Sequence, residues 1–136
     1  REPPARAGRH RIQTGAEENM STITRHGMAA RYSEASVFNG VIYLAGMVPE
    51  GAATDIRGQT QDVLAQIDAH LAAQGSDKTR LLRVQIYLSD IADIGAMNEV
   101  WDAWVAPGHA PPRATVQAAL ADAAWKIEVV ATAAQR

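Results

Sequence analysis

Short runs of β-forming residues open the patterned part of the chain. Residues 22–26 alternate weakly between polar and apolar, and two stronger runs, residues 35–39 and 41–47, meet at Asn39-Gly40. This dipeptide readily adopts the positive φ angles of a type I′ turn, which joins neighbouring antiparallel strands. The pattern predicts one strand followed by a β-hairpin.

The hydrophobic period changes to that of a helix between residues 55 and 74. One helical stripe is apolar and is expected to face the core: Val63, Leu64, Ile67 and Leu71. The opposite side is polar and is expected to face water: Gln59, Asp62, Gln66 and Asp68. Gly75 stands where a C-terminal cap is expected.

The second half of the chain repeats strand and helix patterns. Residues 82–89 have period two, and Asp93 is placed to cap a second helix. The apolar stripe of this helix is Met97, Val100, Trp101, Trp104 and Val105. Two further strands, residues 114–120 and 125–133, are expected to be joined by a short turn around residues 121–124. The predicted order is βββαβαββ, an α+β domain.

Two helices can cover only one face of the resulting mixed sheet. The other face is apolar as well, because Ile42 and Leu44 point one way while Val41 and Tyr43 point the other. An uncovered apolar face needs a cover, and the economical one is a further copy of the same chain. The pattern therefore predicts a homo-oligomer.

The composition fits one soluble domain, with 136 residues and a net charge of -2. No basic stripe with interleaved aromatics indicates nucleic acid as a partner, and no apolar run is long enough to span a membrane. The chain has no cysteine, which excludes thiolate chemistry and suits a reducing compartment, so we expect the cytoplasm. Residues 1–19, with few large apolar side chains, are interpreted as a flexible tail before one domain, residues 20–136.

Motifs for metals and phosphates are missing from the sequence. The histidines His26, His70 and His109 are dispersed, and His10 lies in the expected tail. Neither a His-x-x-His pair nor a Gly-x-x-x-x-Gly-Lys phosphate loop occurs. We therefore expect neither a metal nor a cofactor.

Six segments after Met20 form a set that is specific in its order and spacing. They are residues 41–49 (VIYLAGMVP), Gln59-Thr60 with Ile67, residues 84–90 (VQIYLSD), residues 97–101 (MNEVW), residues 111–116 (PPRATV) and residues 127–131 (IEVVA). Together they resemble the RidA/YjgF family of reactive-intermediate deaminases, also described as endoribonuclease L-PSP proteins. The chain departs from the family pattern where the turn serine and glutamine are Ala45 and Met47, and where a cysteine is Thr115.

The resemblance implies a chorismate-mutase-like fold and a homotrimer with one ligand cleft at each subunit interface. It also implies hydrolysis of 2-imino acids and enamines to 2-oxo acids and ammonia. The family's arginine corresponds to Arg113, its strand glutamate to Glu128, a cleft tyrosine to Tyr32 and a helix asparagine to Asn98. We interpret Arg113 and Glu128 as catalytic, and we interpret Tyr32, Asn98 and Thr115 as further contacts to a small carboxylate substrate.

The two charged residues suit this chemistry. A planar guanidinium holds a carboxylate through two parallel hydrogen bonds, which makes Arg113 a suitable anchor. One carboxylate, that of Glu128, can act as a base toward water and as an acid toward departing ammonia. If the last two strands form a hairpin that turns near Asp122-Ala123, both residues lie on one side of the sheet, about 13 Å apart between Cα atoms.

Each candidate also has a structural interpretation. Arg113 can pair with a surface carboxylate, Tyr32 can pack as an ordinary tyrosine, and Asn98 can bond a loop backbone. The main functional alternative is a non-catalytic module that binds a 2-oxo acid, which Ala45 and Met47 keep open. An RNase is a weaker alternative, because the chain has neither a catalytic histidine pair nor a basic groove.

Overall fold

The computed structural model describes residues 22–136. The expected tail, residues 1–19, and the first residues of the expected domain lie outside this part. The described chain has the predicted order: β1 (Thr24–Met28), β2 (Ser33–Phe38), β3 (Val41–Leu44), α2 (Ile56–Ala73), β4 (Leu81–Leu88), α3 (Ile94–Trp104), β5 (Arg113–Gln117) and β6 (Ile127–Ala134). Two short 3-10 turns, η1 (Lys78–Arg80) and η2 (Ile91–Asp93), precede β4 and α3. The α+β class is confirmed.

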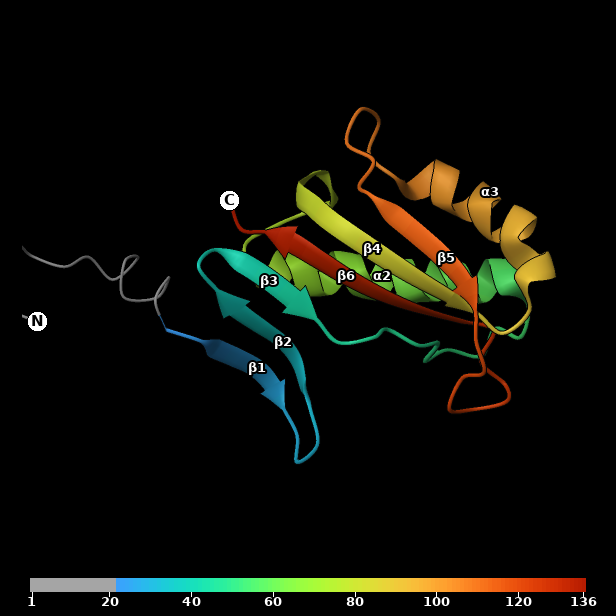
Figure 1. The fold of residues 1–136 in the computed structure, drawn as a ribbon, viewed down its shortest axis with the longest axis horizontal. Coiled ribbons are helices and arrows are strands. Elements are labelled where there is room, and N and C mark those ends of the chain that lie inside the picture. The colour runs from blue at the N-terminus through green and yellow to red at the C-terminus, as the bar shows by residue number, and fades with distance from the viewer. Residues whose placement is uncertain (1–21) are drawn as a thin grey trace, which may run out of the picture.

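The described strands form one mixed sheet with the order β1-β2-β3-β6-β4-β5 (Figure 1). Among them only the edge pair β4 and β5 is parallel, and α3 supplies the crossover that parallel neighbours require. The last strand, β6, enters the middle of the sheet and is antiparallel to both β3 and β4. The outermost strands, β1 and β5, are therefore the two free edges of the sheet.

The predicted first hairpin is confirmed. Phe38 pairs with Val41 across the turn, and the turn residues Asn39 and Gly40 have φ angles of 52° and 75°. Two consecutive positive φ angles are the signature of a type I′ turn, and glycine adopts them without strain. The dipeptide therefore fixes the register of β2 against β3.

The predicted second hairpin, between the last two strands, is wrong. β5 pairs with β4 at the edge, and residues 118–126 carry the chain past β4 to the centre of the sheet. Two apolar runs separated by a short segment look the same whether the connection is a hairpin or skips a strand. The faces of the β5 residues must therefore be read from β4 and not from β6.

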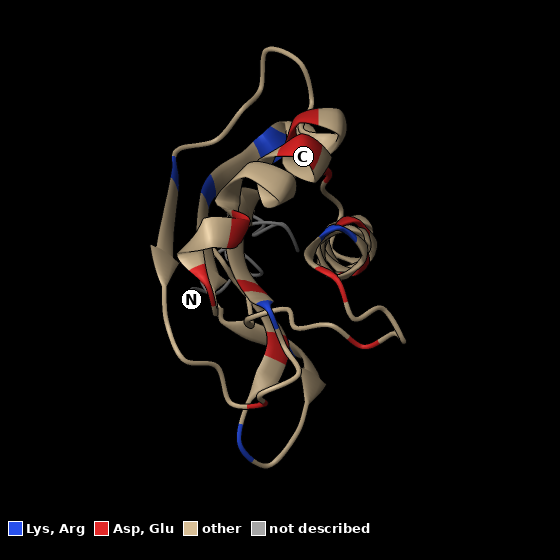
Figure 2. Ribbon diagram, turned by 90° about the vertical axis from the view of Figure 1, so that its right-hand side faces the viewer, with Lys and Arg blue, Asp and Glu red and all other residues tan. Residues whose placement is uncertain are grey.

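The core lies between the sheet and its two helices. Alternate residues of β4 and β6, such as Val84, Ile86 and Val129, are fully buried beneath the helices, and the predicted apolar stripe of α2 meets them. Figure 2 shows α2 end-on beside the sheet. No helix of the described chain covers the opposite face, where Tyr43 and Val116 are 49% and 45% exposed.

The polar side of α2 is not left to water as predicted. Gln59 is only 3% exposed. Its side-chain amide donates to the carbonyls of Ala53 (3.1 Å) and Ala124 (3.0 Å), and its oxygen accepts from the backbone N–H of Lys126 (2.7 Å). The segments before α2 and before β6 fold over this side of the helix, which helical periodicity alone does not reveal.

Asp62, on the same side of α2, holds the loop that follows β3. Its carboxylate accepts from the backbone N–H groups of Glu50 and Gly51, both at 2.8 Å. Partial burial raises the pKa of Asp62, but the hydrogen bonds from Gln66, Gly51 and Glu50 outweigh it and hold that pKa below its usual value. The loop is thus fastened to α2 by an ionised carboxylate.

The helix caps follow the predictions with one exception. The Asp55 side chain accepts from the Gly58 N–H at the start of α2, and Gly75 has a φ of 76° just beyond its end. Asp93 precedes α3, but its side chain makes no capping hydrogen bond. Asp90 accepts from the Ala92 N–H at 2.9 Å, because the short turn η2 begins the helical segment earlier.

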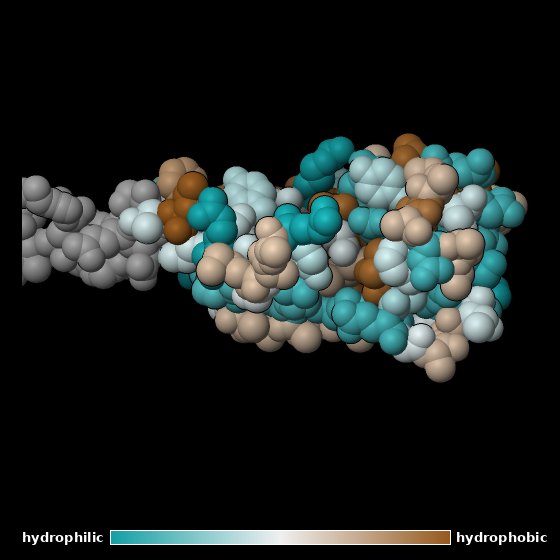
Figure 3. Space-filling model, turned by 90° about the horizontal axis from the view of Figure 1, so that it is seen from below, coloured by the Kyte–Doolittle hydropathy of each residue, from teal (hydrophilic) through white to brown (hydrophobic). Residues whose placement is uncertain are grey.

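The surface mixes polar and apolar side chains. Figure 3 shows hydrophobic patches separated by hydrophilic ones on the face seen from below. The large apolar side chains most open to solvent include Met28 and Tyr32, which are 71% and 57% exposed. Within residues 22–136, no helix combines the length and the hydropathy needed to cross a membrane.

Candidate functional site

β5 places Arg113 and Thr115 on the helix side of the sheet. They pair with Val84 and Ile86 of β4, and residues directly opposite one another in neighbouring strands share a face. Since Val84 and Ile86 are buried beneath the helices, the two β5 side chains point the same way. The Arg113 guanidinium lies over the Trp101 ring of α3, with Cζ 5.0 Å from the ring centroid.

Three buried polar atoms in residues 22–136 have no hydrogen-bond partner: Asn98 Oδ1, Arg113 Nη1 and Thr115 Oγ1. We call these three residues the Arg113 half-site. Arg113 and Thr115 are alternate residues on one face of β5, and Asn98 lies one helical turn before Trp101, whose ring the Arg113 guanidinium contacts. A buried polar group without a partner costs about 1–3 kcal/mol, and a bound ligand would remove that cost.

β6 places Glu128 on the uncovered face. It pairs with Tyr87, whose neighbour Ile86 is buried on the helix side. Glu128 and the exposed Tyr32 line a pocket of about 420 Å³, which we call the Glu128 pocket. Its lining includes three carboxylates, those of Glu34, Glu50 and Glu128, and no Lys or Arg side chain.

Gly46 makes room for the Glu128 carboxylate. A Cβ atom at residue 46 would lie 2.1 Å from Glu128 Oε2 and 3.0 Å from its Cδ, far inside van der Waals contact. Residue 46 follows β3 and precedes Met47, whose backbone exchanges two hydrogen bonds with Val129 at 2.8 and 3.0 Å. Glycine therefore lets the turn pass directly over the carboxylate end of Glu128.

The residues that replace the family's turn serine and glutamine also line this pocket. Ala45 is partly exposed, and Met47 is 3% exposed and packs in the core. Neither side chain can form the strong hydrogen bonds that a serine hydroxyl or a glutamine amide offers. The polar side chains that line the pocket with Glu128 are those of Tyr32, Gln66 and Trp125 and the neighbouring carboxylates of Glu34 and Glu50.

The predicted one-sided arrangement of Arg113 and Glu128 is wrong. Arg113 shares the face of Val84, and Glu128 shares the face of Tyr87, so the two side chains leave opposite faces of the sheet. The error follows from the assumed hairpin, because a change of strand partner reverses the parity. Within one chain, Arg113 shares a face of β5 with Thr115 and contacts Trp101, one helical turn from Asn98. Glu128 and Tyr32 line one pocket.

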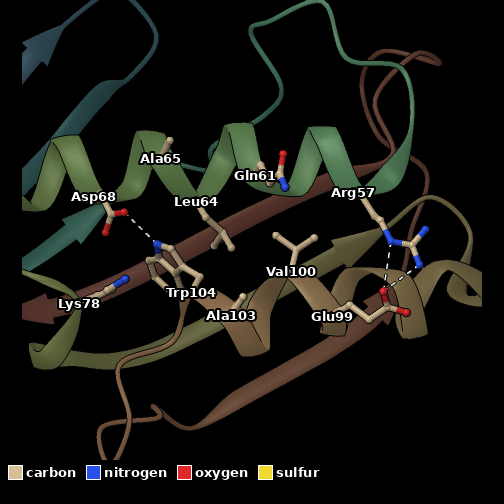
Figure 4. A pocket seen from close by; sticks show the side chains of 10 residues that line it. All are labelled: Arg57, Gln61, Leu64, Ala65, Asp68, Lys78, Glu99, Val100, Ala103 and Trp104. Atoms are coloured by element: carbon tan, nitrogen blue, oxygen red, sulfur yellow. Dashed lines mark hydrogen bonds and ion pairs between the residues drawn. The ribbon is translucent and has the colours of Figure 1, made fainter.

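A groove between α2 and α3 contains none of the predicted site residues (Figure 4). It measures about 470 Å³. Arg57 at one end is paired with Glu99 at 3.0 Å, and the Trp104 indole N–H near the other end donates to Asp68 at 2.9 Å. Lys78 lies over the same Trp104 ring, and none of the three buried polar atoms without a partner in residues 22–136 belongs to the groove.

Sequence reasoning missed two residues that contact the candidate side chains. Trp101 was assigned to the core, and its 6% exposure agrees, but its ring also carries Arg113. Gly46 stands in the sequence only as one position of the segment 41–49, with nothing to mark its contact with Glu128. No three His, Cys, Asp or Glu side chains within residues 22–136 are grouped so that they could hold a metal ion.

Comparison with known proteins decides the family. The family model described as Endoribonuclease L-PSP matches residues 22–135. The crystal structure of NMB1025 from Neisseria meningitidis, described as a member of the YjgF protein family, superposes with a TM-score of 0.84 at 50% identity and covers 86% of this chain and 98% of that one. The chain belongs to the RidA/YjgF family.

Two curated RidA/YjgF relatives show how the chain compares by sequence. A RutC family protein of Haemophilus ducreyi is 48% identical over 112 residues, which are 82% of this chain and 96% of that protein. The chloroplastic Reactive Intermediate Deaminase A of Arabidopsis thaliana is 29% identical over 119 residues, which cover 83% of this chain and 63% of that protein. A deaminase thus stands among the RidA/YjgF relatives.

Proposed function

We propose that this chain hydrolyses 2-imino acids, and the enamines in equilibrium with them, to 2-oxo acids and ammonia. The reaction consumes one water and needs neither a redox step nor a cofactor: the C=N bond is replaced by C=O, and the nitrogen leaves as ammonia. The observation that carries the proposal is the Arg113 half-site, whose three buried polar atoms have no protein partner in the described chain. Membership of a family that includes a named reactive intermediate deaminase supports the reaction class.

The complete site forms between two copies of the chain in this proposal. The Arg113 half-site and the Glu128 pocket leave opposite faces of one sheet, so one copy's half-site must meet another copy's pocket. Contact between two different surfaces of identical chains is heterologous, and it closes into a ring when the rotation permits. A homotrimeric ring, acting in the cytoplasm, would also cover the free sheet face that carries Tyr43 and Val116.

Arg113 anchors the substrate. Its guanidinium offers parallel N–H groups to the carboxylate beside the imine carbon. Thr115 and Asn98 supply a hydroxyl and an amide near the same anchor, where they would hold the substrate's orientation. Fixing the carboxylate also fixes C2, the atom that water attacks, which lowers the entropic part of the barrier.

Glu128 of the neighbouring copy moves the protons. As a carboxylate it takes a proton from water while the oxygen attacks C2 of the protonated imine, which gives a neutral tetrahedral adduct carrying both OH and NH2. The protonated carboxyl then gives that proton to the amine nitrogen. Ammonia leaves as the C=O bond forms, and the Glu128 carboxylate takes up the hydroxyl proton, which is finally released with ammonia as ammonium. Tyr32 lines the same pocket and can donate a hydrogen bond to the reacting water.

The test uses imines made in place by an amino-acid oxidase, with release of the 2-oxo acid followed against buffer alone. Arg113→Ala should lower kcat/KM by about a thousandfold, because two charge-assisted hydrogen bonds are lost. Arg57→Ala is the matched control and should keep wild-type turnover, since Arg57 pairs with Glu99 on the outer helix surface. Wild-type rates equal to those of buffer would end the enzyme proposal.

A non-catalytic binding module is the second candidate. The Arg113 half-site favours this candidate because binding a 2-oxo acid needs an anchor for the carboxylate and no proton carrier. In that case calorimetry would show 2-oxo acid binding that requires Arg113, while imine turnover would stay at the rate of buffer. Ala45 and Met47 stand beside Glu128 where the family has two polar turn residues. This less polar wall is the feature that supports a binding module.

A further inference from the structure

An arginine that anchors a substrate carboxylate has to be held in place without being neutralised. A protein carboxylate would position it well but would occupy the same N–H groups that the substrate needs. The two ion pairs found in residues 22–136 join Arg57 to Glu99 and Arg136 to Asp77, so neither involves Arg113. Some other contact must therefore orient the guanidinium.

Trp101 provides that contact. Its indole ring is 6% exposed, and the Arg113 Cζ lies 5.0 Å from the ring centroid, within the range of a cation–π interaction. An aromatic face attracts the guanidinium through its π electrons and leaves the N–H groups free in the plane. This arrangement agrees with Arg113 Nη1 being buried and without a hydrogen-bond partner.

The Trp101 ring is itself fixed from behind. Trp104, one turn further along α3, packs against it with centroids 5.4 Å apart and ring planes at 50°. The Trp104 indole N–H donates to Asp68 of α2 at 2.9 Å, as Figure 4 shows, and Lys78 lies over the same ring. A hydrogen bond between the two helices thus fixes the orientation of the Trp104 ring. Trp104 packs against Trp101 and holds its ring in place, and the Trp101 ring in turn holds the Arg113 guanidinium.

We propose that Trp101 is a positioning residue for the substrate anchor: its ring orients the Arg113 guanidinium while leaving the N–H groups available to the substrate carboxylate. The effect of Trp101 on substrate binding rests on the proposed function, but its contact with Arg113 can be measured without any substrate. Trp101 acts through Arg113, so its loss should weaken carboxylate binding more than it slows the chemical step.

The first measurement is spectroscopic and uses the ligand-free protein. The Nε–H resonance of Arg113, assigned by its loss in Arg113→Lys, should be shifted by the ring current of Trp101 in the wild type. Trp101→Leu should abolish that shift and Trp101→Phe should keep part of it. An Arg113 resonance that is the same in wild type and Trp101→Leu would overturn the inference, whatever the protein catalyses.

The second measurement is 2-oxo acid affinity and imine turnover at a temperature where each variant is folded by circular dichroism. Trp101→Leu should weaken binding and raise KM by about tenfold, with a smaller change in kcat, and Trp101→Phe should restore most of the affinity. Val100→Ala is the matched control, because it truncates an apolar residue of the same helix that lines the groove toward α2 and packs against the core. It should weaken binding less than Trp101→Leu does.

The outcomes separate the two proposals. Wild-type protein that shows the ring-current shift but neither binds a 2-oxo acid nor hydrolyses imines would end the proposed function and leave the contact standing. Wild-type activity with equal losses of affinity in Trp101→Leu and Val100→Ala would keep the proposed function and overturn the specific role of Trp101, because general destabilisation of α3 would then explain both.

Discussion

The Arg113 half-site and the Glu128 pocket differ in charge and in how their polar groups are held. In the first, one guanidinium lies on an aromatic ring among buried atoms without partners. In the second, carboxylates from Glu34, Glu50 and Glu128 gather around an open pocket that no cationic side chain lines. In the proposed function, the first surface binds an anion and the second accepts protons.

The difference explains why one chain is insufficient for the proposed chemistry. A 2-imino acid needs an anchor for its carboxylate and a proton carrier near its nitrogen, and the two are on opposite faces of one sheet. Opposite charges on two different surfaces of the same chain also favour head-to-tail contact between copies. In the proposed function, assembly and chemistry therefore have the same structural origin. The following variants test each side of the comparison.

Glu128→Gln is expected to have the largest effect. It keeps the shape of the side chain but removes the proton carrier, so kcat should fall by about a thousandfold. The affinity for a 2-oxo acid should change little, because Arg113 does the anchoring. The contrast with Arg113→Ala, which should lose affinity, would separate binding from proton transfer. Equal loss of 2-oxo acid affinity in both variants would remove that division of roles.

Gly46→Ala should come next, with turnover lower by about a hundredfold. The added Cβ would lie 2.1 Å from Glu128 Oε2, and since that atom ends a flexible side chain, the carboxylate should rotate away while the fold persists. Gly95→Ala is the control: nothing lies within 4 Å of its Cβ position, in α3. Steady-state rates with thermal unfolding check both variants, and wild-type turnover in Gly46→Ala would show that the carboxylate position is unimportant.

Gln59→Leu should mainly affect stability, lowering the free energy of unfolding by about 2 kcal/mol. It leaves the carbonyls of Ala53 and Ala124 and the N–H of Lys126 without the partners they have now. Gln61→Leu, an exposed change two positions along α2, should cost little. Urea unfolding compares them, and equal midpoints would mean that water replaces the Gln59 amide at no cost.

The smallest effect concerns Asp77, which lies outside both halves of the site. Hydrogen bonds from the Thr79 hydroxyl and N–H, and the ion pair with Arg136, lower its pKa from 3.8 to about 2. A carboxylate whose pKa is lower in the folded state stabilises the fold above pH 3.8, and this contribution is lost as the pH falls through about 2. Asp77→Asn should therefore lower the urea midpoint slightly at pH 6, with the difference shrinking toward pH 2.

A midpoint difference that stays constant from pH 6 to pH 2 would contradict this account of Asp77. The pH dependence of Asp77→Asn also helps to compare the Arg113 half-site with the Glu128 pocket. Because the contribution of Asp77 to stability changes only in acid, between about pH 4 and pH 2, any change of turnover with pH near neutrality has to come from other groups.

The sequence predicted the local features of the fold well and the long-range ones less well. Asn39-Gly40, the α2 stripe and Gly75 depend on neighbours along the chain, and the structure has each of them in place. The partner of β5 depends on contacts between distant segments, which period and turn signals do not encode. That single error placed Arg113 and Glu128 on one face.

The site was predicted in part for the same reason. The family resemblance pointed to Asn98, Arg113 and Thr115, and each of these residues carries a buried polar atom without a hydrogen-bond partner within residues 22–136. Their role in a site stays a prediction. The contact of Trp101 with Arg113 looks in the sequence like one more apolar position of a helix stripe. Gly46 likewise looks like a turn glycine until the position of Glu128 is known.

Mixed oligomers test the central claim most directly. Arg113→Ala and Glu128→Gln chains, each inactive alone, are unfolded together in equal amounts, refolded and assayed for imine hydrolysis. If each cleft takes Arg113 from one copy and Glu128 from the next, about a quarter of the clefts in randomly assembled rings are intact, and about a quarter of wild-type activity should return. A mixture as inactive as its parents, although mass measurements show that the chains have exchanged, would contradict a site shared between copies.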